Sequence, residues 1–168
     1  MRSERIAFLG GGNMAEAIIG GLLAGGISME KHLVAADPAA ERRALLEGKY
    51  GIETTADNAA AVRAADVVVL AIKPQQVAEA LAALKGTFTG KQLLVSICAG
   101  LPTSALEAQV PARVARVMPN LPALVRRGVS AVCGGARSTA CGPVPSACGR
   151  CRRCRSSCWA ACWWVSCR

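Results

Sequence analysis

The first residues that could do chemistry form the pattern Gly10-x-Gly12-x-x-Ala15, directly after the apolar run 6–9. Gly10 permits a tight turn, Gly12 lets the backbone approach a pyrophosphate, and the small Ala15 lets a helix pack close to the preceding strand. The run 13–24 then predicts a helix, whose free N–H groups and positive dipole end attract phosphate oxygens. The pattern therefore predicts a site for the pyrophosphate of a dinucleotide; the alternative is a structural turn that binds nothing.

Asp37 is the candidate for contact with the adenosine ribose. It lies 25 residues after the second glycine of this pattern, at the end of the apolar run 33–36. An acidic residue at this place usually hydrogen-bonds the ribose hydroxyls, which favours NAD. Arg42 and Arg43 follow closely and could meet a 2′-phosphate instead, so the residues leave NAD and NADP both open. Asp37 could also be only the N-cap of a helix that has Pro38 at its first position.

Two more candidates follow predicted strands. Lys73 comes after the apolar run 67–72 and is fixed by Pro74, so it could contact a ribose or a phosphate of the cofactor. The alternative is an ordinary solvated lysine at a strand end. Asn120 follows Pro119, in a proline-bounded loop near the expected position of a substrate ring, although that loop could be no more than a rigid connection.

The sequence shows no side-chain set for nucleophilic or acid–base catalysis. Cys98 follows the run 93–97, among small residues that let a nicotinamide approach the backbone, and we interpret its thiol as a small apolar filler. The one histidine, His32, lies before a different strand and is not its partner. The pattern fits hydride transfer, in which the cofactor carries the chemistry and the protein supplies orientation. We therefore expect no catalytic side chain and no metal ion.

Strands and helices must alternate to position these residues. The apolar runs predict strands over 6–9, 33–36, 51–55, 67–72, 93–97 and 114–118. Periodicity and cap residues predict helices over 13–24, 38–50, 58–65, 75–84 and 102–110, with Asp57 or Asn58 capping the third. Such alternation predicts an α/β fold with a doubly wound parallel sheet, in which ligands sit outside the carboxyl ends of the strands.

Charge and cysteine divide the chain into two parts. Residues 1–110 hold 10 Lys and Arg against 11 Asp and Glu, a net charge of −1, whereas residues 111–168 hold 10 Arg and no acid, a net charge of +10. Cys98 is the only cysteine before residue 133, and eight follow from there. The basic balance therefore belongs to the tail. With no signal-peptide pattern and no apolar run of 18 residues, we expect a cytoplasmic protein that binds neither membrane nor nucleic acid.

Four stretches resemble pyrroline-5-carboxylate reductase, the last enzyme of proline biosynthesis. They are 8–22, which holds the glycine pattern, Ala71-Ile-Lys-Pro-Gln75, Val95-Ser-Ile-Cys-Ala-Gly100 and Arg116-Val-Met-Pro-Asn120. The second and fourth are specific to the family, whereas the glycine turn is not. The resemblance covers about residues 4–137 and implies a Rossmann-like NAD(P)-binding domain. It favours this family over another reductase of the same fold, such as a 3-hydroxyacid dehydrogenase.

The resemblance also implies which residues bind the cofactor. They are Leu9, Gly10, Gly11, Gly12, Asn13, Met14, Asp37, Asn58, Ala71, Ile72, Lys73, Pro74, Ile97, Cys98 and Ala99, with Asn120 close to the substrate. The implied reaction is hydride transfer from NAD(P)H to the C=N bond of 1-pyrroline-5-carboxylate, which gives L-proline. The family generally prefers NADPH, and Asp37 departs from the Ser or Asn-Arg often found there.

Two further departures bear on activity. Leu121 stands where the family has Thr in a Met-Pro-Asn-Thr-Pro loop, which we expect to weaken function. The family continues into a helical domain that carries a Ser-Gly-Ser-Gly-Pro substrate motif and builds a homo-oligomer, and the printed sequence contains no such segment. We therefore expect weak NADPH binding and negligible turnover by the 168-residue chain, which makes a binding module without turnover the alternative function.

Residues 138–168 differ from the dinucleotide-binding domain predicted over 1–137. From residue 141 on they lack Leu, Ile, Lys, Asp and Glu, and no period of 2 or 3.6 organises them. We interpret this Cys- and Arg-rich tail as disordered or as a coding sequence read out of frame. The spacing Cys148-x2-Cys151-x2-Cys154-x3-Cys158 leaves an iron–sulfur or zinc site as the alternative, and an Arg-rich nucleic-acid patch as another.

Overall fold

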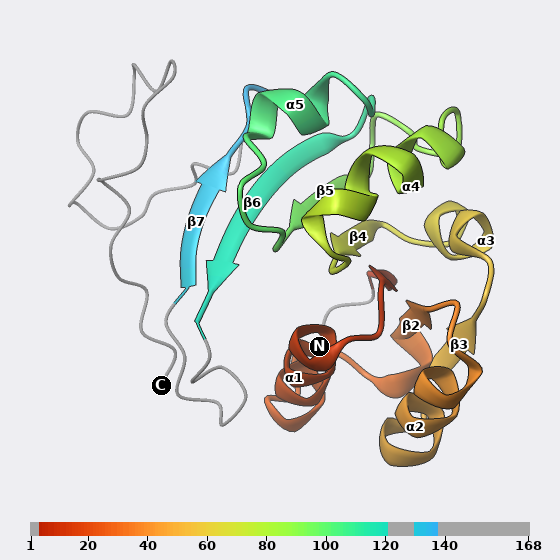
Figure 1. Cartoon of the computed structure of the whole chain (residues 1–168). Coiled ribbons are helices and arrows are strands. Elements are labelled where there is room, and N and C mark those ends of the chain that lie inside the picture. The colour runs from red at the N-terminus through yellow and green to blue at the C-terminus, as the bar shows by residue number, and fades with distance from the viewer. Residues whose placement is uncertain (1–3, 121–129, 138–168) are drawn as a thin grey trace.

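The described residues, 4–120 and 130–137 of a computed structural model, form a seven-stranded sheet with the order β3-β2-β1-β4-β5-β6-β7 (Figure 1). Strands β1 to β6 are parallel, and β7 is antiparallel to β6. The strands are β1 Ile6–Leu9, β2 Leu33–Ala36, β3 Glu53–Thr55, β4 Val67–Leu70, β5 Leu93–Ser96, β6 Arg113–Pro119 and β7 Ser130–Gly134. The order of the parallel strands is that of a doubly wound dinucleotide-binding sheet.

Helices cover both faces of this sheet. The helices are α1 Asn13–Ala24, α2 Ala40–Tyr50, α3 Asn58–Arg63, α4 Val77–Ala83 and α5 Thr103–Glu107, with 3₁₀ turns η1 Glu30–His32 and η2 Pro74–Gln76. α1 and α2 pack on one face, whereas α3, α4 and α5 pack on the other. Successive strand residues alternate between the two faces, so that Phe8 contacts the first layer while Ala7 and Leu9 contact the second.

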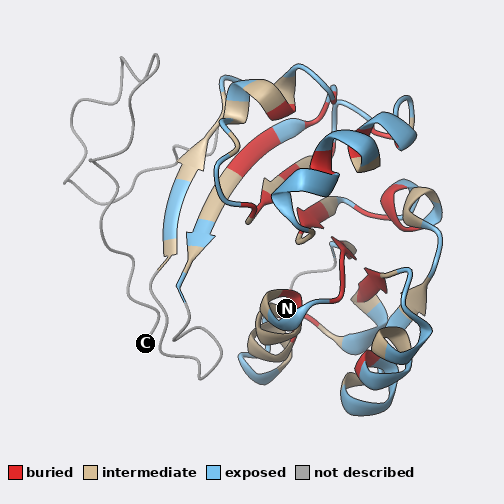
Figure 2. Ribbon diagram, viewed as in Figure 1, coloured by how far each residue is buried: buried red, intermediate tan, exposed pale blue. Residues whose placement is uncertain are grey.

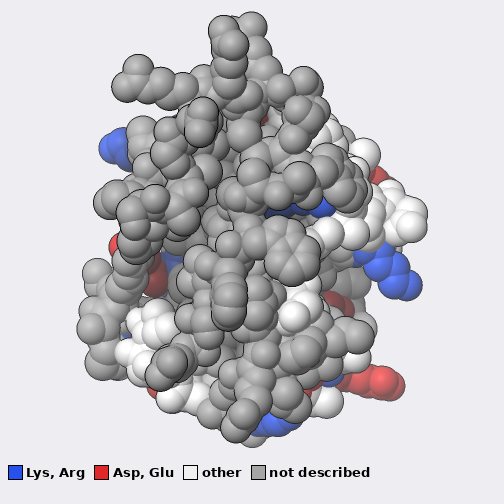
Figure 3. Space-filling model, turned by 90° about the vertical axis from the view of Figure 1, so that its left-hand side faces the viewer, with Lys and Arg blue, Asp and Glu red and all other residues white. Residues whose placement is uncertain are grey.

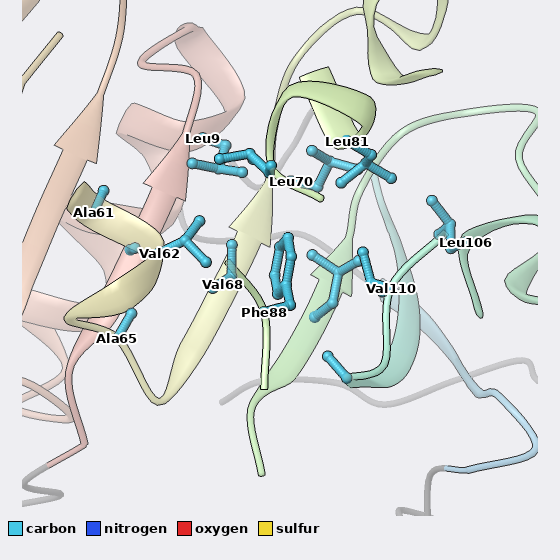
Figure 4. Close-up of a cluster of buried hydrophobic side chains, with 14 of the residues drawn as sticks. Leu9, Ala61, Val62, Ala65, Val68, Leu70, Leu81, Phe88, Leu106 and Val110 are labelled. Atoms are coloured by element: carbon cyan, nitrogen blue, oxygen red, sulfur yellow. The ribbon is translucent and has the colours of Figure 1, made fainter. Parts of the chain in front are cut away.

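The core consists of two apolar clusters, one on each face. The larger lies under α3, α4 and α5, where Val62, Leu81 and Phe88 meet side chains of β4 (Figure 4). The smaller joins Ile19 of α1 and Leu46 of α2 to the sheet. Figure 2 shows the buried strands at the centre and the exposed outer faces of the helices. Strands buried on both faces need continuous apolar runs, which is why the central strands carry few polar residues.

The structure confirms the predicted doubly wound sheet, and strands 6–9 and 33–36 and helix 13–24 match residue for residue. Most other elements keep their place but are shorter, and 75–84 divides into η2 and α4. The antiparallel β7 is absent from the sequence prediction, because it pairs at the sheet edge with half-buried and exposed residues.

The predicted N-cap role of Asp37 is wrong. α2 begins at Ala40, and Ala39 occupies the N-cap position without a side-chain bond to the helix. The carboxylate of Asp37 instead accepts the N–H of Gly11, 26 residues earlier in the chain, and that of Ala39. A tertiary hydrogen bond has therefore replaced the local cap.

The described residues include charged side chains of both signs. On the face that Figure 3 shows, their basic and acidic side chains are interspersed rather than gathered by sign. None of the helices in the described ranges is both long and apolar enough to span a membrane. The predictions for the Cys- and Arg-rich tail, and for Leu121, lie outside the described residues.

Candidate functional site

The register of the sheet brings the predicted site segments to one edge. Leu9, the last residue of β1, pairs with Ala36 of β2 and Leu70 of β4, and Leu70 pairs with Ser96 of β5. Each of these residues is the last of its strand. The segments that follow, which hold the glycine turn, Asp37, Ala71–Pro74 and Ile97–Ala99, therefore leave the sheet side by side at its carboxyl edge. The chain reverses its strand order between β1 and β4, the place where such sheets bind ligands.

Gly10 lets two of these segments touch. Its φ is 97°, and its N–H donates to the carbonyl of Ala36 at 2.8 Å. A Cβ on Gly10 would lie 2.7 Å from the carbonyl oxygen of Ala71 and 2.9 Å from Cγ2 of Ile72. Only glycine allows both the left-handed backbone and this close approach. The turn and the segment after β4 thus form one continuous surface.

Gly12 faces open space at the start of α1. It is the N-cap residue, with extended backbone, and no side chain caps the helix in the described part of the chain. The N–H of Glu16 is bonded to the carbonyl of Gly12 at 2.9 Å, which leaves the amides of Asn13, Met14 and Ala15 without a partner inside the helix. A Cβ on Gly12 would meet no described atom within 4 Å. Free amides, the dipole and open space together suit a phosphate.

Asp37 binds the middle of the turn. Its Oδ2 accepts the N–H of Gly11 at 2.8 Å and its Oδ1 that of Ala39 at 2.9 Å. Each oxygen of a carboxylate has room for a second donor, so Asp37 can still accept a ribose hydroxyl. Its main-chain N–H donates to Thr55 at the end of β3, which ties the neighbouring strand to the same edge.

Arg42 and Arg43 have protein partners. Arg43 donates to the carbonyls of Asp37 at 2.7 Å and Pro38 at 2.9 Å. Arg42 donates through Nε to the carbonyl of Gly11 and forms an ion pair with Glu16. The sequence offered both arginines as contacts for a 2′-phosphate, but the donors named here already have acceptors.

Asn58 is the first residue of α3, and Asp57 is its cap. Oδ1 of Asp57 accepts the N–H groups of Ala59 at 2.8 Å and Ala60 at 3.2 Å. Of the two caps that the sequence allows, the structure selects Asp57. The role of Asn58 on the adenosine side stays a prediction.

Cys98 joins the segments after β4 and β5. Its thiol is buried and donates to the carbonyls of Leu70 at 3.4 Å and Ile72 at 3.2 Å. Burial raises the pKa of the Cys98 thiol, which keeps it protonated at neutral pH. This agrees with a filler rather than a nucleophile. Ile97, its neighbour, donates its N–H to Leu70 at 3.2 Å.

The remaining predicted residues line the same edge or extend past it. Lys73, Pro74 and Ala99 are exposed, as a surface that meets a ligand requires. β6 continues three residues beyond Arg116, which pairs with Ser96, so Asn120 lies past the cofactor edge. The described residues contain no group of three His, Cys, Asp or Glu side chains that could hold a metal ion.

Sequence reasoning missed Glu16, in the first turn of α1. Its Oε1 accepts from Nζ of Lys49 at 2.8 Å and from the hydroxyl of Tyr50 at 3.3 Å, while Oε2 faces Arg42. The hydrogen bond from Lys49, with help from Arg42, holds the pKa of Glu16 below its usual range. The spacing of Arg42 and Lys49, two helical turns apart on one face of α2, is the signal that could have found this partner.

Comparison with known proteins shows which families this chain resembles. Residues 5–100 match the family described as NADP oxidoreductase, coenzyme F420-dependent. A pyrroline-5-carboxylate reductase of Pseudomonas aeruginosa is 46% identical over 142 residues, 83% of this chain and 52% of the relative. The solved pyrroline-5-carboxylate reductase of Coxiella burnetii superimposes with a TM-score of 0.77 at 32% identity, over 83% of this chain and 52% of that one.

A third similar protein was solved with its cofactor. The pyrroline carboxylate reductase of Plasmodium falciparum, with NADP bound, superimposes with a TM-score of 0.73 at 27% identity, over 83% of this chain and 51% of that one. The chain spans about half the length of the relatives it matches. It belongs to the family described as NADP oxidoreductase, coenzyme F420-dependent, and it matches about half the length of pyrroline-5-carboxylate reductases.

Proposed function

We propose that the chain binds NADP(H) at the carboxyl edge of its sheet, with the pyrophosphate on the amides of Asn13 and Met14. The observation that carries this proposal is the N-terminus of α1, which no described side chain caps and where a Cβ on Gly12 would meet no described atom within 4 Å. Ala71–Pro74 and Ile97–Ala99 would line the nicotinamide half, and Asp37 and Asn58 the adenosine half. The relative solved with NADP bound favours NADP over NAD, whereas Asp37 keeps NAD in competition.

The proposed reaction is that of the matching relatives, reduction of 1-pyrroline-5-carboxylate to L-proline. The bound cofactor supplies the hydride. The chain's own residues bind and orient it, and Asn120 stands past the cofactor edge, where a substrate would approach. Because the chain spans half of its relatives' length, we expect the 168-residue chain to bind nucleotide weakly and to form proline at a negligible rate.

The remaining assignments stay proposals as well. We assign residues 1–137 to the dinucleotide-binding domain and 138–168 to a separate tail. We place the protein in the cytoplasm, as for an enzyme whose partners are a small imine and a nicotinamide nucleotide. We propose a homo-oligomer for the full-length relatives only, and not for the 168-residue chain.

Titration of the chain with NADPH, followed by the nucleotide's own fluorescence, tests the proposal. Gly12→Val fills the space meant for the pyrophosphate, and because φ of Gly12 is −65°, valine causes no backbone strain there. We expect Gly12→Val to fold normally and to weaken NADPH binding by roughly tenfold or more.

Gly48→Val is the matched control, because Gly48 is exposed on α2 and a Cβ there also meets no described atom. It should bind NADPH as the unaltered chain does. Equal affinity in the Gly12→Val and Gly48→Val variants would show that nucleotide does not bind at the turn.

A further inference from the structure

Both polar backbone groups of Gly11 are held by side chains from beyond β2. Its N–H donates to Asp37 at 2.8 Å, and its carbonyl accepts from Nε of Arg42. The residue is buried, and a Cβ on it would lie 2.9 Å from Cδ1 of Leu46 and 3.3 Å from Cγ of Arg42. The orientation of the peptides on either side of Gly11 therefore depends on α2 as well as on the turn itself.

Arg42 is held in turn by α1. Nη2 of Arg42 forms an ion pair with Oε2 of Glu16. Oε1 of Glu16 accepts hydrogen bonds from Lys49 and Tyr50. The side chains of Arg42 and Glu16 are 21% and 18% exposed, so water screens this pair less than a pair on the surface. The first turn of α1, the glycine turn and α2 are thus joined by one network of hydrogen bonds and ion pairs at the start of α1.

We propose that Arg42 and Glu16 are positioning residues for the pyrophosphate of the dinucleotide. By holding the Gly11 carbonyl on the α2 side, Arg42 keeps a negative dipole away from the phosphates and keeps the amides of Asn13 and Met14 aimed at them. The inference rests on the proposed nucleotide binding and adds how the site is organised before the ligand arrives. It also assigns Arg42 a role independent of the 2′-phosphate.

The test compares NADPH with NADH, which differ only in the 2′-phosphate. Arg42→Leu should weaken the binding of both nucleotides by the same factor, about tenfold, because the lost contact is a charge-assisted hydrogen bond common to both complexes. The ratio of the two dissociation constants should stay that of the unaltered chain. In the nucleotide-free protein, the amides of residues 11–14 should exchange with deuterium faster in the variant.

Arg113→Leu is the matched control. Arg113 also donates to a backbone carbonyl, that of Lys91 at 3.1 Å, but at the opposite edge of the sheet. Both dissociation constants should be unchanged in this variant. If Arg42→Leu fails to fold, Glu16→Gln removes the charged partner of Arg42 with little change of shape, and the same equal loss for NADPH and NADH is expected.

Two results would overturn this inference and leave the proposed nucleotide binding intact. One is unchanged affinity for both nucleotides in Arg42→Leu, and the other is a loss for NADPH only, which would make Arg42 a reader of the 2′-phosphate. If the unaltered chain binds neither nucleotide, the proposed function fails, and the inference fails with it.

Discussion

At the scale of single residues, the three glycines of the turn have different roles. Gly10 combines a φ of 97° with a contact that leaves no space for a Cβ, whereas Gly12 has an ordinary φ and open space. Gly11 is enclosed by Leu46 and Arg42. The sequence pattern predicts the turn at Gly10 and the phosphate approach at Gly12, but it gives no role to Gly11, whose neighbours come from α2. The structure gives Gly10 and Gly11 roles in the fold and leaves the Cβ side of Gly12 open.

Gly10→Ala should therefore destabilise the protein. The substituted Cβ would meet the backbone of Ala71, which cannot move without disturbing the strand that precedes it. We expect a loss of about 1–3 kcal/mol in the free energy of unfolding, measured by urea denaturation. Gly26→Ala serves as the comparison, because Gly26 has a φ of 62° but an open Cβ position. An equal loss in the two variants would mean that the contact with Ala71 adds nothing.

At the scale of elements, tertiary contacts decide where α2 begins and how it sits on α1. Asp37 and Pro38 form a standard start for a helix, and that local signal predicts a beginning two residues too early. Asp37 is drawn instead to Gly11 in the turn after β1. α2 then returns Arg42 and Lys49 to Glu16 on α1. The spacing of Arg42 and Lys49 does mark one charged face of α2, but nothing in the local sequence marks Asp37 as the partner of Gly11, 26 residues away.

The ion pairs between α1 and α2 should make stability depend on pH in the acid range. The pKa of Glu16 is lowered in the folded protein, so its contribution is complete above the ordinary value of 4.5 and is lost as the pH falls through the lower folded value. In Glu16→Gln this loss should be missing, and the difference in unfolding free energy between the two proteins should shrink below pH 4.5. Urea denaturation across this range measures it. A difference that stays constant with pH would show that the carboxylate charge contributes no stability.

At the scale of the whole molecule, continuous apolar runs and glycine turns are enough to predict the doubly wound sheet. Strands such as β4 are buried on both faces and so cannot carry polar residues. β7 escaped prediction, because an edge strand that pairs on one side only can expose Ala131 and Val132. The segments of the candidate site were predictable from strand ends, whereas the network behind them depends on non-local contacts. The individual cofactor contacts stay predictions.

The central claim is that a dinucleotide pyrophosphate binds at the start of α1. Backbone amide chemical shifts, followed by NMR as NADPH is added to the 168-residue chain, test this claim most directly. The largest changes should occur at Gly12, Asn13 and Met14, with smaller ones at Ala71–Pro74 and Ile97–Ala99. The account would be contradicted if the chemical shifts of these three amides stayed constant in excess nucleotide. It would also be contradicted if only other residues changed.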